Sequence, residues 1–214
     1  MIRLHGFALS NYTNMCKFAL LEKGLDFEEV TVMPSQDPEH KKMSPMGKLP
    51  VLETENGFIS ETAAIIGYLE TVYPSPSLFP GDPFAAGKVR EMVKILELYI
   101  ELQGRRHYPE LFFGGERDES AYKEVRPVIE NALVAIRRLA SFSPYLMGEF
   151  SMADIAAYQS FCYAAPVCQA LYDWDIVAEV PGLGEAINNT KRRNAGVIVE
   201  DAHQAGLKAM QEGS

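Results

Sequence analysis

Four prolines between residues 74 and 83 divide this chain of 214 residues into two stretches of different pattern. Proline lacks the backbone N–H that helices and sheets use, so this stretch can form the interior of neither. Short apolar runs precede it, whereas long segments of helical period follow it. We therefore expect a first domain at residues 1–76, a linker at residues 77–84 and a second domain at residues 85–214.

The first domain has the pattern of an α/β fold. Ile2–His5 and Phe27–Val32 are predicted strands, and Thr13–Lys23 is a predicted helix between them. A helical connection implies that the two strands are parallel. An Asn-Gly pair then predicts a β-hairpin across residues 51–59, and Thr62–Val72 is a further predicted helix. This order of elements is that of a thioredoxin-like domain.

The second domain is predicted to be an all-α helical bundle. Its apolar residues recur every three or four positions, as on one face of a helix. Such stripes run through residues 89–100, 122–140 and 152–168, and a further helix follows Pro181. Pro127 is expected to kink the second of these helices.

Charge and composition exclude several classes of partner. The net charge of −9 argues against nucleic acid, which needs a concentrated basic surface. The densest basic cluster, Lys191-Arg192-Arg193, is interpreted as the solvated end of a helix. No apolar run is long enough to span a membrane, and the first residues lack the shape of a signal peptide, so we expect a cytoplasmic protein. The three cysteines lack metal-ligand spacing, which predicts reduced thiols and no metal site.

Two stretches of the first domain are candidates for ligand binding. Pro50 stands directly before a predicted strand, which suggests that Leu49 presents its N–H and C=O sideways, where an extended peptide-like ligand could pair with them. Glu61 and Thr62 stand at the start of a predicted helix, where free N–H groups and the helix dipole favour anions.

Ser10 lies in the loop between the first strand and the first helix. Its spacing to the helix favours a capping role, because a serine oxygen satisfies free N–H groups there. The alternative is a catalytic role, in which the hydroxyl donates a hydrogen bond to a thiolate and lowers the pKa of the thiol. Asn11 and Tyr12 are close enough to be alternative donors.

Several motifs together resemble one enzyme family. Gly47-Lys48-Leu49-Pro50-Val51-Leu52, the run SETAAIIGYL that begins at Ser60, the Ser10 loop and Ser151-Met152-Ala153-Asp154 occur in the order and spacing of the cytosolic glutathione transferases. The register from Ser10 to Gly24 is similar to the serine-type classes of that family, which are the phi, theta and zeta classes and bacterial relatives. The resemblance covers nearly the whole chain.

The resemblance implies an enzyme in which the thiolate of glutathione attacks a small hydrophobic electrophile, with a role in detoxification. Ser10 would stabilise the thiolate, or Tyr12 or Asn11 in its place. Lys48 would bind the glycyl carboxylate, and the backbone of Leu49 would pair with the cysteinyl part of glutathione. Family members are homodimers, so a homodimer is expected here.

The remaining implied contacts hold the other end of glutathione. Pro50 is expected to form a cis peptide bond. Glu61 would bind the γ-glutamyl ammonium, and Thr62 would bind the carboxylate beside it. The Ser151–Asp154 motif is expected to be a structural capping box.

A second-substrate pocket is expected between the loop that contains Leu9 and the first helices of the second domain. Large aromatic residues are usually buried, so the candidates could equally belong to the core. The candidate lining residues are Leu9, Tyr99, Gln103, Arg106, Tyr108 and Phe112.

Two alternatives to conjugation stay open at this point. The first is another glutathione-dependent reaction on the same fold, such as peroxide reduction or isomerisation. The second is a non-catalytic protein that keeps the fold for binding or regulation. The complete set Lys48, Glu61 and Thr62 argues against the second, because a structural relic has no need of a peptide clamp.

Overall fold

The computed structural model describes residues 1–212, which form two compact units. The first unit combines Met1–Leu78 with the C-terminal segment that begins at Lys191, and the second unit is Phe79–Thr190. The first contains a mixed sheet and the second is helical, which confirms the predicted fold class. None of the helices within residues 1–212 has an apolar stretch long enough to cross a lipid bilayer.

The sheet of the first unit has four strands in the order β2-β1-β3-β4. They are β1 (Ile2–Gly6), β2 (Phe27–Thr31), β3 (Val51–Thr54) and β4 (Gly57–Ser60). As predicted, β1 and β2 are parallel, while β3 runs antiparallel to both β1 and β4. The Asn-Gly pair lies at the turn between β3 and β4 and starts the last strand.

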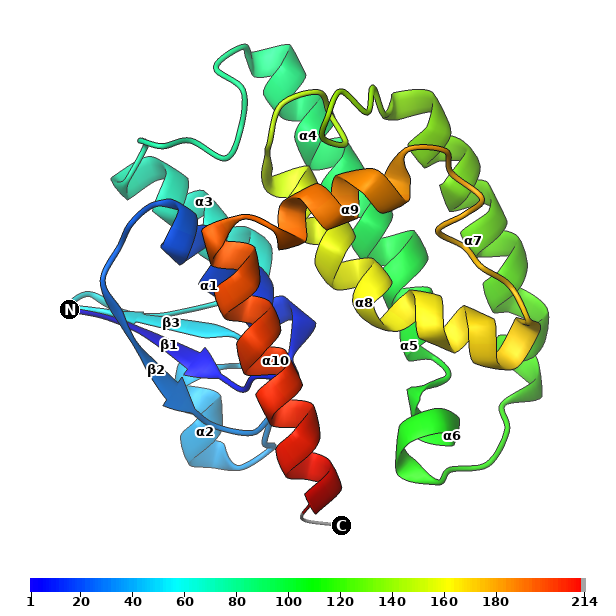
Figure 1. The fold of residues 1–214 in the computed structure, drawn as a ribbon. Helices are drawn as coiled ribbons and strands as arrows, with labels where there is room; N and C mark the ends of the chain where they lie inside the picture. The colour runs from blue at the N-terminus through cyan, green and yellow to red at the C-terminus, as the bar shows by residue number, and fades with distance from the viewer. Residues whose placement is uncertain (213–214) are drawn as a thin grey trace. The chain divides into compact units, whose positions relative to one another are not determined.

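Helices α1 (Asn11–Glu22), α3 (Thr62–Val72) and α10 (Asn194–Glu212) pack within this unit. Helix α1 contacts β1, α3 and α10, and Figure 1 shows α10 running alongside it. The core contains fully buried apolar side chains from the sheet and from α1 and α3, among them Leu4, Phe18, Leu52, Ile65 and Leu69. A short helix, α2 (Pro38–Met43), lies in the region before β3.

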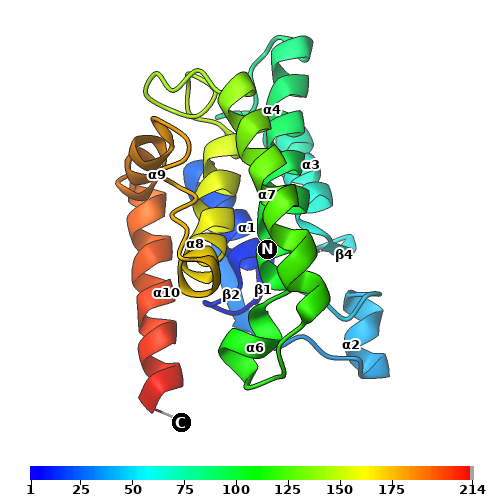
Figure 2. The same cartoon turned by 90° about the vertical axis from the view of Figure 1, so that its right-hand side faces the viewer.

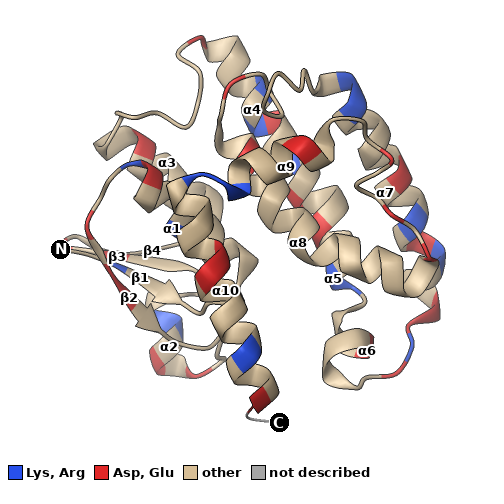
Figure 3. Cartoon of the chain, viewed as in Figure 1, with Lys and Arg blue, Asp and Glu red and all other residues tan. Residues whose placement is uncertain are grey.

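Helix α10 groups with the first unit, whereas the predicted boundaries placed it in the second domain. Two contacts explain the grouping. A Cβ added at Gly206 would lie 3.1 Å from Leu9 Cδ2, so the helix lies tightly against the loop before α1. Arg193 donates to both carboxylate oxygens of Glu22, at 2.8 and 2.6 Å. The basic stretch at residues 191–193, blue at the start of α10 in Figure 3, is therefore partly ion-paired rather than only solvated.

A buried ion pair holds the end of the first unit in place. Lys23 is fully enclosed at its side chain, and its Nζ lies 2.7 Å from Glu70 Oε1. The same ammonium donates to the carbonyl oxygens of Tyr73 at 2.8 Å and Pro76 at 2.9 Å. Glu70 in turn accepts from the backbone N–H of Leu78 at 3.1 Å. The proline-rich stretch is thus tied to this unit as far as Leu78.

The second unit is a helical bundle whose members run from α4 to α9. Helix α8 packs against α4, η1 and α5, and Figure 2 shows α7 alongside α4, with which it is in contact. The bounds are α4 (Pro83–Ile95), η1 (Leu96–Glu101), α5 (Leu102–Arg105), α6 (Tyr108–Phe113), α7 (Glu119–Leu139), α8 (Met152–Tyr172) and α9 (Leu183–Lys191).

The helix that begins at α4 is not regular throughout, contrary to the prediction from its apolar stripe. It continues as the π-helical turn η1 and then as the short helix α5. The buried residues Leu96 and Ile100 both lie in η1, so the apolar face of the helix continues through the π-helical turn. Pro127 lies inside α7, and the kink expected there stays a prediction.

Helix α8 begins with a buried capping box, as predicted. The carboxylate of Asp154 accepts hydrogen bonds from the backbone N–H of Leu146 at 2.7 Å and of Ser151 at 2.9 Å. Ser151 Oγ accepts from Ala153 N at 3.3 Å. Burial raises the pKa of Asp154 to about 6, against the opposing effect of these hydrogen bonds. The box joins the start of α8 to the loop around Leu146.

Asp154→Ala should lower the free energy of unfolding by about 2–4 kcal/mol, because two buried N–H groups lose their acceptor. Asp118 is a matched control, since it caps α7 from an exposed position and accepts from Ser120 N at 2.9 Å. Asp118→Ala should cost only about 1 kcal/mol. Urea unfolding of both variants measures the difference, and equal losses would contradict a special role for the buried box.

The raised pKa of Asp154 predicts a pH dependence of stability. The folded state binds this proton more tightly than the unfolded state, so the contribution of Asp154 to stability is largest below its ordinary pKa. That contribution should fall by about 1–3 kcal/mol as the pH rises from about 4 to about 6. Asp154→Asn cannot titrate, so its stability relative to wild type should improve over this range. A constant difference between the two proteins would contradict the prediction.

Candidate active site

Three strand ends meet at one edge of the sheet. Val51, the first residue of β3, pairs with His5 near the end of β1 and with Ser60 at the end of β4. The chain therefore leaves β1 toward Ser10, enters β3 from Leu49 and leaves β4 into Glu61 along the same edge. This register brings together the three segments that carry the predicted glutathione contacts.

Ser10 is the N-cap of α1. Its backbone is extended, with φ −83° and ψ 109°, and its Oγ accepts from Thr13 N at 3.2 Å. The hydroxyl oxygen is therefore an acceptor within the protein, while no group among residues 1–212 accepts its proton. The capping role and the role of outward donor, left open by the sequence, are compatible in this geometry.

Close contacts beneath Ser10 hold its loop in place. A Cβ added at Gly6 would lie 2.4 Å from Thr13 Oγ1, so only glycine fits where the end of β1 meets α1. Asn14 Nδ2 donates to the carbonyl oxygen of Ala8 at 2.9 Å. Sequence reasoning missed Gly6 and Asn14, although a glycine at the end of a strand and an asparagine in the first helical turn are typical of such contacts.

The two alternative donors differ from Ser10 in their surroundings. Asn11 is buried and Tyr12 is half-buried in the first turn of α1. Each already takes part in other interactions, so neither is free in the way that the hydroxyl proton of Ser10 is. Cys16 is fully buried and lies in the core.

The segment before β3 presents a free peptide unit and a free cation. The Leu49–Pro50 bond is cis, as the resemblance implies. Leu49 lies outside the strand ladder, and neither its N–H nor its C=O is hydrogen-bonded within residues 1–212. Lys48 is exposed, and no described carboxylate pairs with its ammonium. This segment can therefore pair with an extended ligand and with a carboxylate.

Ser44, which sequence reasoning missed, and Gly47, which belongs to the predicted motif, fix the position of Lys48. The hydroxyl of the buried Ser44 accepts from Lys48 N at 3.0 Å and donates to Lys48 O at 2.6 Å. Gly47 has a φ of +67°, and a Cβ there would lie 2.3 Å from the carbonyl oxygen of Ser35. Only glycine satisfies both conditions, which explains this residue in the motif.

Glu61 adopts an unusual backbone conformation at the start of α3. Its φ of 71° and ψ of 122° lie in a region that non-glycine residues rarely adopt, at a cost of about 1–3 kcal/mol. Its side chain is exposed, does not cap the helix, and has no cationic partner among the described residues. Thr62 follows as the first helical residue and is buried. The free N–H groups of this first turn favour an anion, and the Glu61 carboxylate favours a cation.

The charges at this edge suit a ligand of defined polarity. Lys48 offers a cation for a carboxylate, and Glu61 offers an anion for an ammonium. Leu49 provides free backbone groups for the part of the ligand between them. A short peptide with charged ends and a polar centre has this pattern of groups.

The predicted lining of a second-substrate pocket falls in both units. Leu9 belongs to the first unit, where it lies against Gly206, and the other candidates belong to the second. Tyr99 and Phe112 are each 47% exposed, so neither is a core residue. The pocket itself stays a prediction.

The polar candidates in the second unit already have partners. Arg106 forms an ion pair with Glu124 at 2.9 Å, and Gln103 donates to the carbonyl oxygen of Leu98 at 3.2 Å. The ring of Tyr108 packs edge-on against Phe112, with 5.2 Å between ring centroids, and burial raises the pKa of its hydroxyl. The surface between Tyr108 and Phe112 is thus apolar, while Arg106 is not a free cation.

Comparisons with known proteins agree with this geometry. Residues 4–77 match the family described as glutathione S-transferase, N-terminal domain. A glutathione S-transferase of Pseudomonas putida is 40% identical over 100% of this chain and 94% of its own length. A maleylacetoacetate isomerase of Pseudomonas aeruginosa is 24% identical over 86% of this chain and 92% of its own length.

Solved structures give the same result. A glutathione S-transferase from Methylobacterium radiotolerans in complex with glutathione sulfonate is 27% identical, covers 92% of this chain and 93% of its own, and superposes with a TM-score of 0.77. A glutathione S-transferase from Rhodospirillum rubrum is 26% identical, covers 93% and 91%, and gives a TM-score of 0.75. The full-length match at 40% identity decides the assignment: this chain is an enzyme of the glutathione S-transferase family.

Proposed function

We propose that this enzyme conjugates glutathione to small hydrophobic electrophiles, with Ser10 as the donor to the reacting thiolate. The hydroxyl of Ser10 carries the proposal, because its oxygen is held by the Thr13 N–H while its proton has no acceptor within residues 1–212. A thiolate placed before α1 would accept this proton and would also lie near the positive end of the helix dipole.

The energy required is within reach of these two effects. A thiol has an ordinary pKa of about 8.5, and lowering it by one unit needs about 1.4 kcal/mol of preference for the anion. A hydrogen bond to a charged group contributes roughly 1.5–3 kcal/mol, and a helix N-terminus roughly 0.3–1 kcal/mol. Together they would make the thiolate the main form near neutral pH, where it can attack an electrophile.

The remaining contacts would orient the tripeptide. Lys48 would bind the glycyl carboxylate, Leu49 would pair with the cysteinyl backbone, and Glu61 with Thr62 would hold the γ-glutamyl end. Support comes from the groups that have no hydrogen-bond or ion-pair partner among residues 1–212. These are the ammonium of Lys48, the peptide groups of Leu49 and the carboxylate of Glu61. We also propose that the enzyme is a cytoplasmic homodimer.

Isomerisation is the second candidate reaction. The observation in its favour is the similarity to the maleylacetoacetate isomerase over most of both chains. The same thiolate would add to a conjugated double bond, allow rotation about the resulting single bond and leave again, so glutathione would be regenerated. Assays with an aryl halide, a hydroperoxide and a cis-enone acid distinguish conjugation, peroxide reduction and isomerisation.

Ser10→Ala should lower kcat/KM for an aryl halide by roughly 10–100-fold, since the thiolate loses a charge-assisted hydrogen bond. The dissociation constant of glutathione should change by less than about threefold, because the peptide clamp is intact. The ultraviolet absorbance of bound thiolate against pH should show a pKa raised by about one unit or more.

Tyr12→Phe is the matched control for Ser10→Ala, and thermal unfolding of both variants reports the loss of the N-cap. Full activity in Ser10→Ala together with lost activity in Tyr12→Phe would transfer the role to Tyr12. If neither variant loses activity, Asn11 becomes the candidate donor to the thiolate.

Glu61→Gln and Lys48→Gln should each weaken glutathione binding by at least about tenfold, because each removes one charge partner of the ligand. At saturating glutathione, kcat should change little. Glu55 and Lys41 are exposed residues of the same unit that are not among the predicted contacts, so Glu55→Gln and Lys41→Gln serve as charge-matched controls. Isothermal titration measures the affinities, and equal effects of the controls would mean that only net charge matters.

A further inference from the structure

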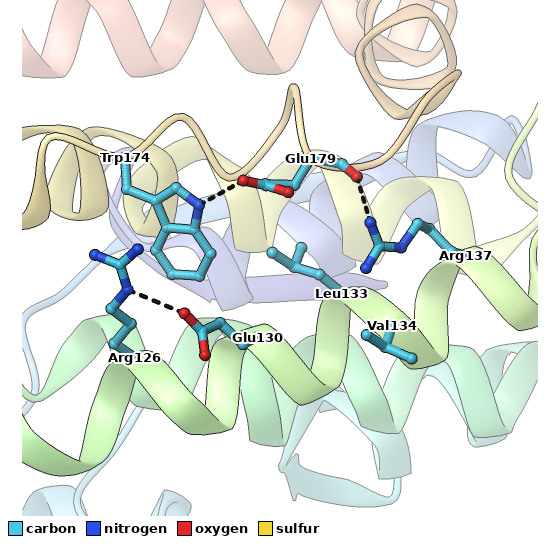
Figure 4. Close-up of a pocket in the computed structure, with 7 residues that line it drawn as sticks. All are labelled: Arg126, Glu130, Leu133, Val134, Arg137, Trp174 and Glu179. Atoms are coloured by element: carbon cyan, nitrogen blue, oxygen red, sulfur yellow. Dashed lines mark hydrogen bonds and ion pairs between the residues drawn. The ribbon is translucent and has the colours of Figure 1, made fainter.

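A pocket in the second unit is lined by none of the residues assigned to glutathione. It has a volume of about 260 Å³ and lies between α7 and the segment that follows α8 (Figure 4). Its lining residues are Arg126, Glu130, Leu133, Val134, Arg137, Trp174 and Glu179. Because all of them belong to the second unit, the pocket is complete within that unit.

One face of α7 forms the floor of the pocket. Residues 126, 130, 133 and 137 follow one another at spacings of four, three and four, and residue 134 is four positions after 130, so their side chains share one side of the helix. Leu133 is buried and occupies the middle, as Figure 4 shows, with Glu130 and Val134 on either side. The centre of the floor is therefore apolar, with charged groups toward its ends.

Trp174 forms a fixed apolar wall. Its indole Nε1 donates to Glu179 Oε1 at 3.0 Å, and the guanidinium of Arg126 lies 4.9 Å from the centre of its ring. Only 8% of the residue is exposed. Contacts on both sides hold the ring in one position, so the pocket is formed before any ligand arrives.

The charges in the pocket do not all cancel. Arg126 pairs with Glu130, with 3.0 Å between Nε and Oε1. Arg137 donates to the backbone carbonyl of Glu179 at 3.0 Å, but no carboxylate of the described chain forms an ion pair with it. The carboxylate of Glu179 likewise has no cationic partner among residues 1–212. One unpaired cation and one unpaired anion thus line the same small space.

We propose that this pocket binds a free α-amino acid with an apolar side chain. The carboxylate of the ligand would bind Arg137, its ammonium would bind Glu179, and its side chain would contact Leu133, Val134 and Trp174. A simple anion would face the Glu179 carboxylate, and a simple cation would face Arg137, so a zwitterion is the species that suits both. The volume lies below the roughly 300–1,000 Å³ of pockets for drug-sized ligands, which favours a ligand of amino-acid size.

The protein contains a single tryptophan, so intrinsic tryptophan fluorescence reports on this pocket alone. Titration of the full-length protein with L-phenylalanine, excited where only tryptophan absorbs, should give a saturable change in Trp174 emission in the millimolar range or below. Phenylpropionate lacks the ammonium and phenethylamine lacks the carboxylate, so each should bind at least about tenfold more weakly.

Arg137→Gln and Glu179→Gln should each weaken L-phenylalanine binding by at least about tenfold. Arg138→Gln is the matched control, because Arg138 is an exposed neighbour that does not line the pocket. Glutamine at 179 retains an acceptor for the indole N–H. The emission spectrum of each ligand-free variant and its melting temperature establish that the pocket is intact.

Several outcomes would overturn the proposal. One is the absence of a saturable change with L-phenylalanine in the wild-type protein, confirmed by isothermal titration. Another is equal binding of phenylpropionate or phenethylamine, which would mean that the pocket recognises one charge only. A third is unchanged affinity in Arg137→Gln and Glu179→Gln, or equal loss in Arg138→Gln. Glutathione affinity should be the same in all three variants.

Discussion

The pairing of β3 with β1 and β4 is the constraint on which the proposed glutathione site depends. Val51 faces His5 on one side and Ser60 on the other, and this single register sets the positions of the segments that carry Ser10, Leu49 and Glu61. Val51 and Leu52 are neighbours in the strand, so their side chains point to opposite faces, and a slip of one residue would exchange these faces and disrupt the packing on both. Both residues are fully buried, so the hydrophobic core and the position of the site depend on the same pairing.

Some charged side chains of this protein are buried in ion pairs that hold the fold together, whereas others are exposed, unpaired within the described part of the chain and available to a ligand. Lys23 with Glu70, and Arg193 with Glu22, are enclosed or partly enclosed pairs whose hydrogen bonds tie distant segments together. The side chains of Lys48 and Glu61 are exposed and have no ion-pair partner among the described residues. Their backbones are nevertheless held in place, that of Lys48 by hydrogen bonds with Ser44 and that of Glu61 by its position at the start of α3. A fixed backbone that carries an unpaired charge is pre-organised for a ligand, since little ordering remains to be done on binding. Arg137 and Glu179 meet the same criterion in the second unit.

Sequence patterns specified the strands, α1, α3 and the capping box, because alternation, an Asn-Gly turn and Ser/Asp spacing are local signals. They also located Ser10, Lys48, Leu49, Glu61 and Thr62 as candidates, through the resemblance rather than through spacing alone. The π-helical turn η1 was missed because its apolar residues still follow a helical stripe. Ser44, Gly6 and Asn14 were missed because their contacts appear only when separate segments pack together. The position of α10 depends on contacts between Arg193 and Glu22, 171 positions earlier, and between Gly206 and Leu9, 197 positions earlier, which no local pattern reveals.

Glu61 shows how stability and function conflict at the site. A non-glycine residue with φ 71° costs about 1–3 kcal/mol, and glycine at this position would relieve that strain. Glycine, however, would remove the one carboxylate that points away from the protein at the start of α3. The strain is tolerated because the residues on both sides are fixed: Ser60 by its pairing with Val51, and the helix by the buried side chains of Ile65, Ile66 and Leu69. The chain therefore keeps a locally unfavourable residue where the surrounding fold can hold it and where, in the proposed site, it would bind a ligand ammonium.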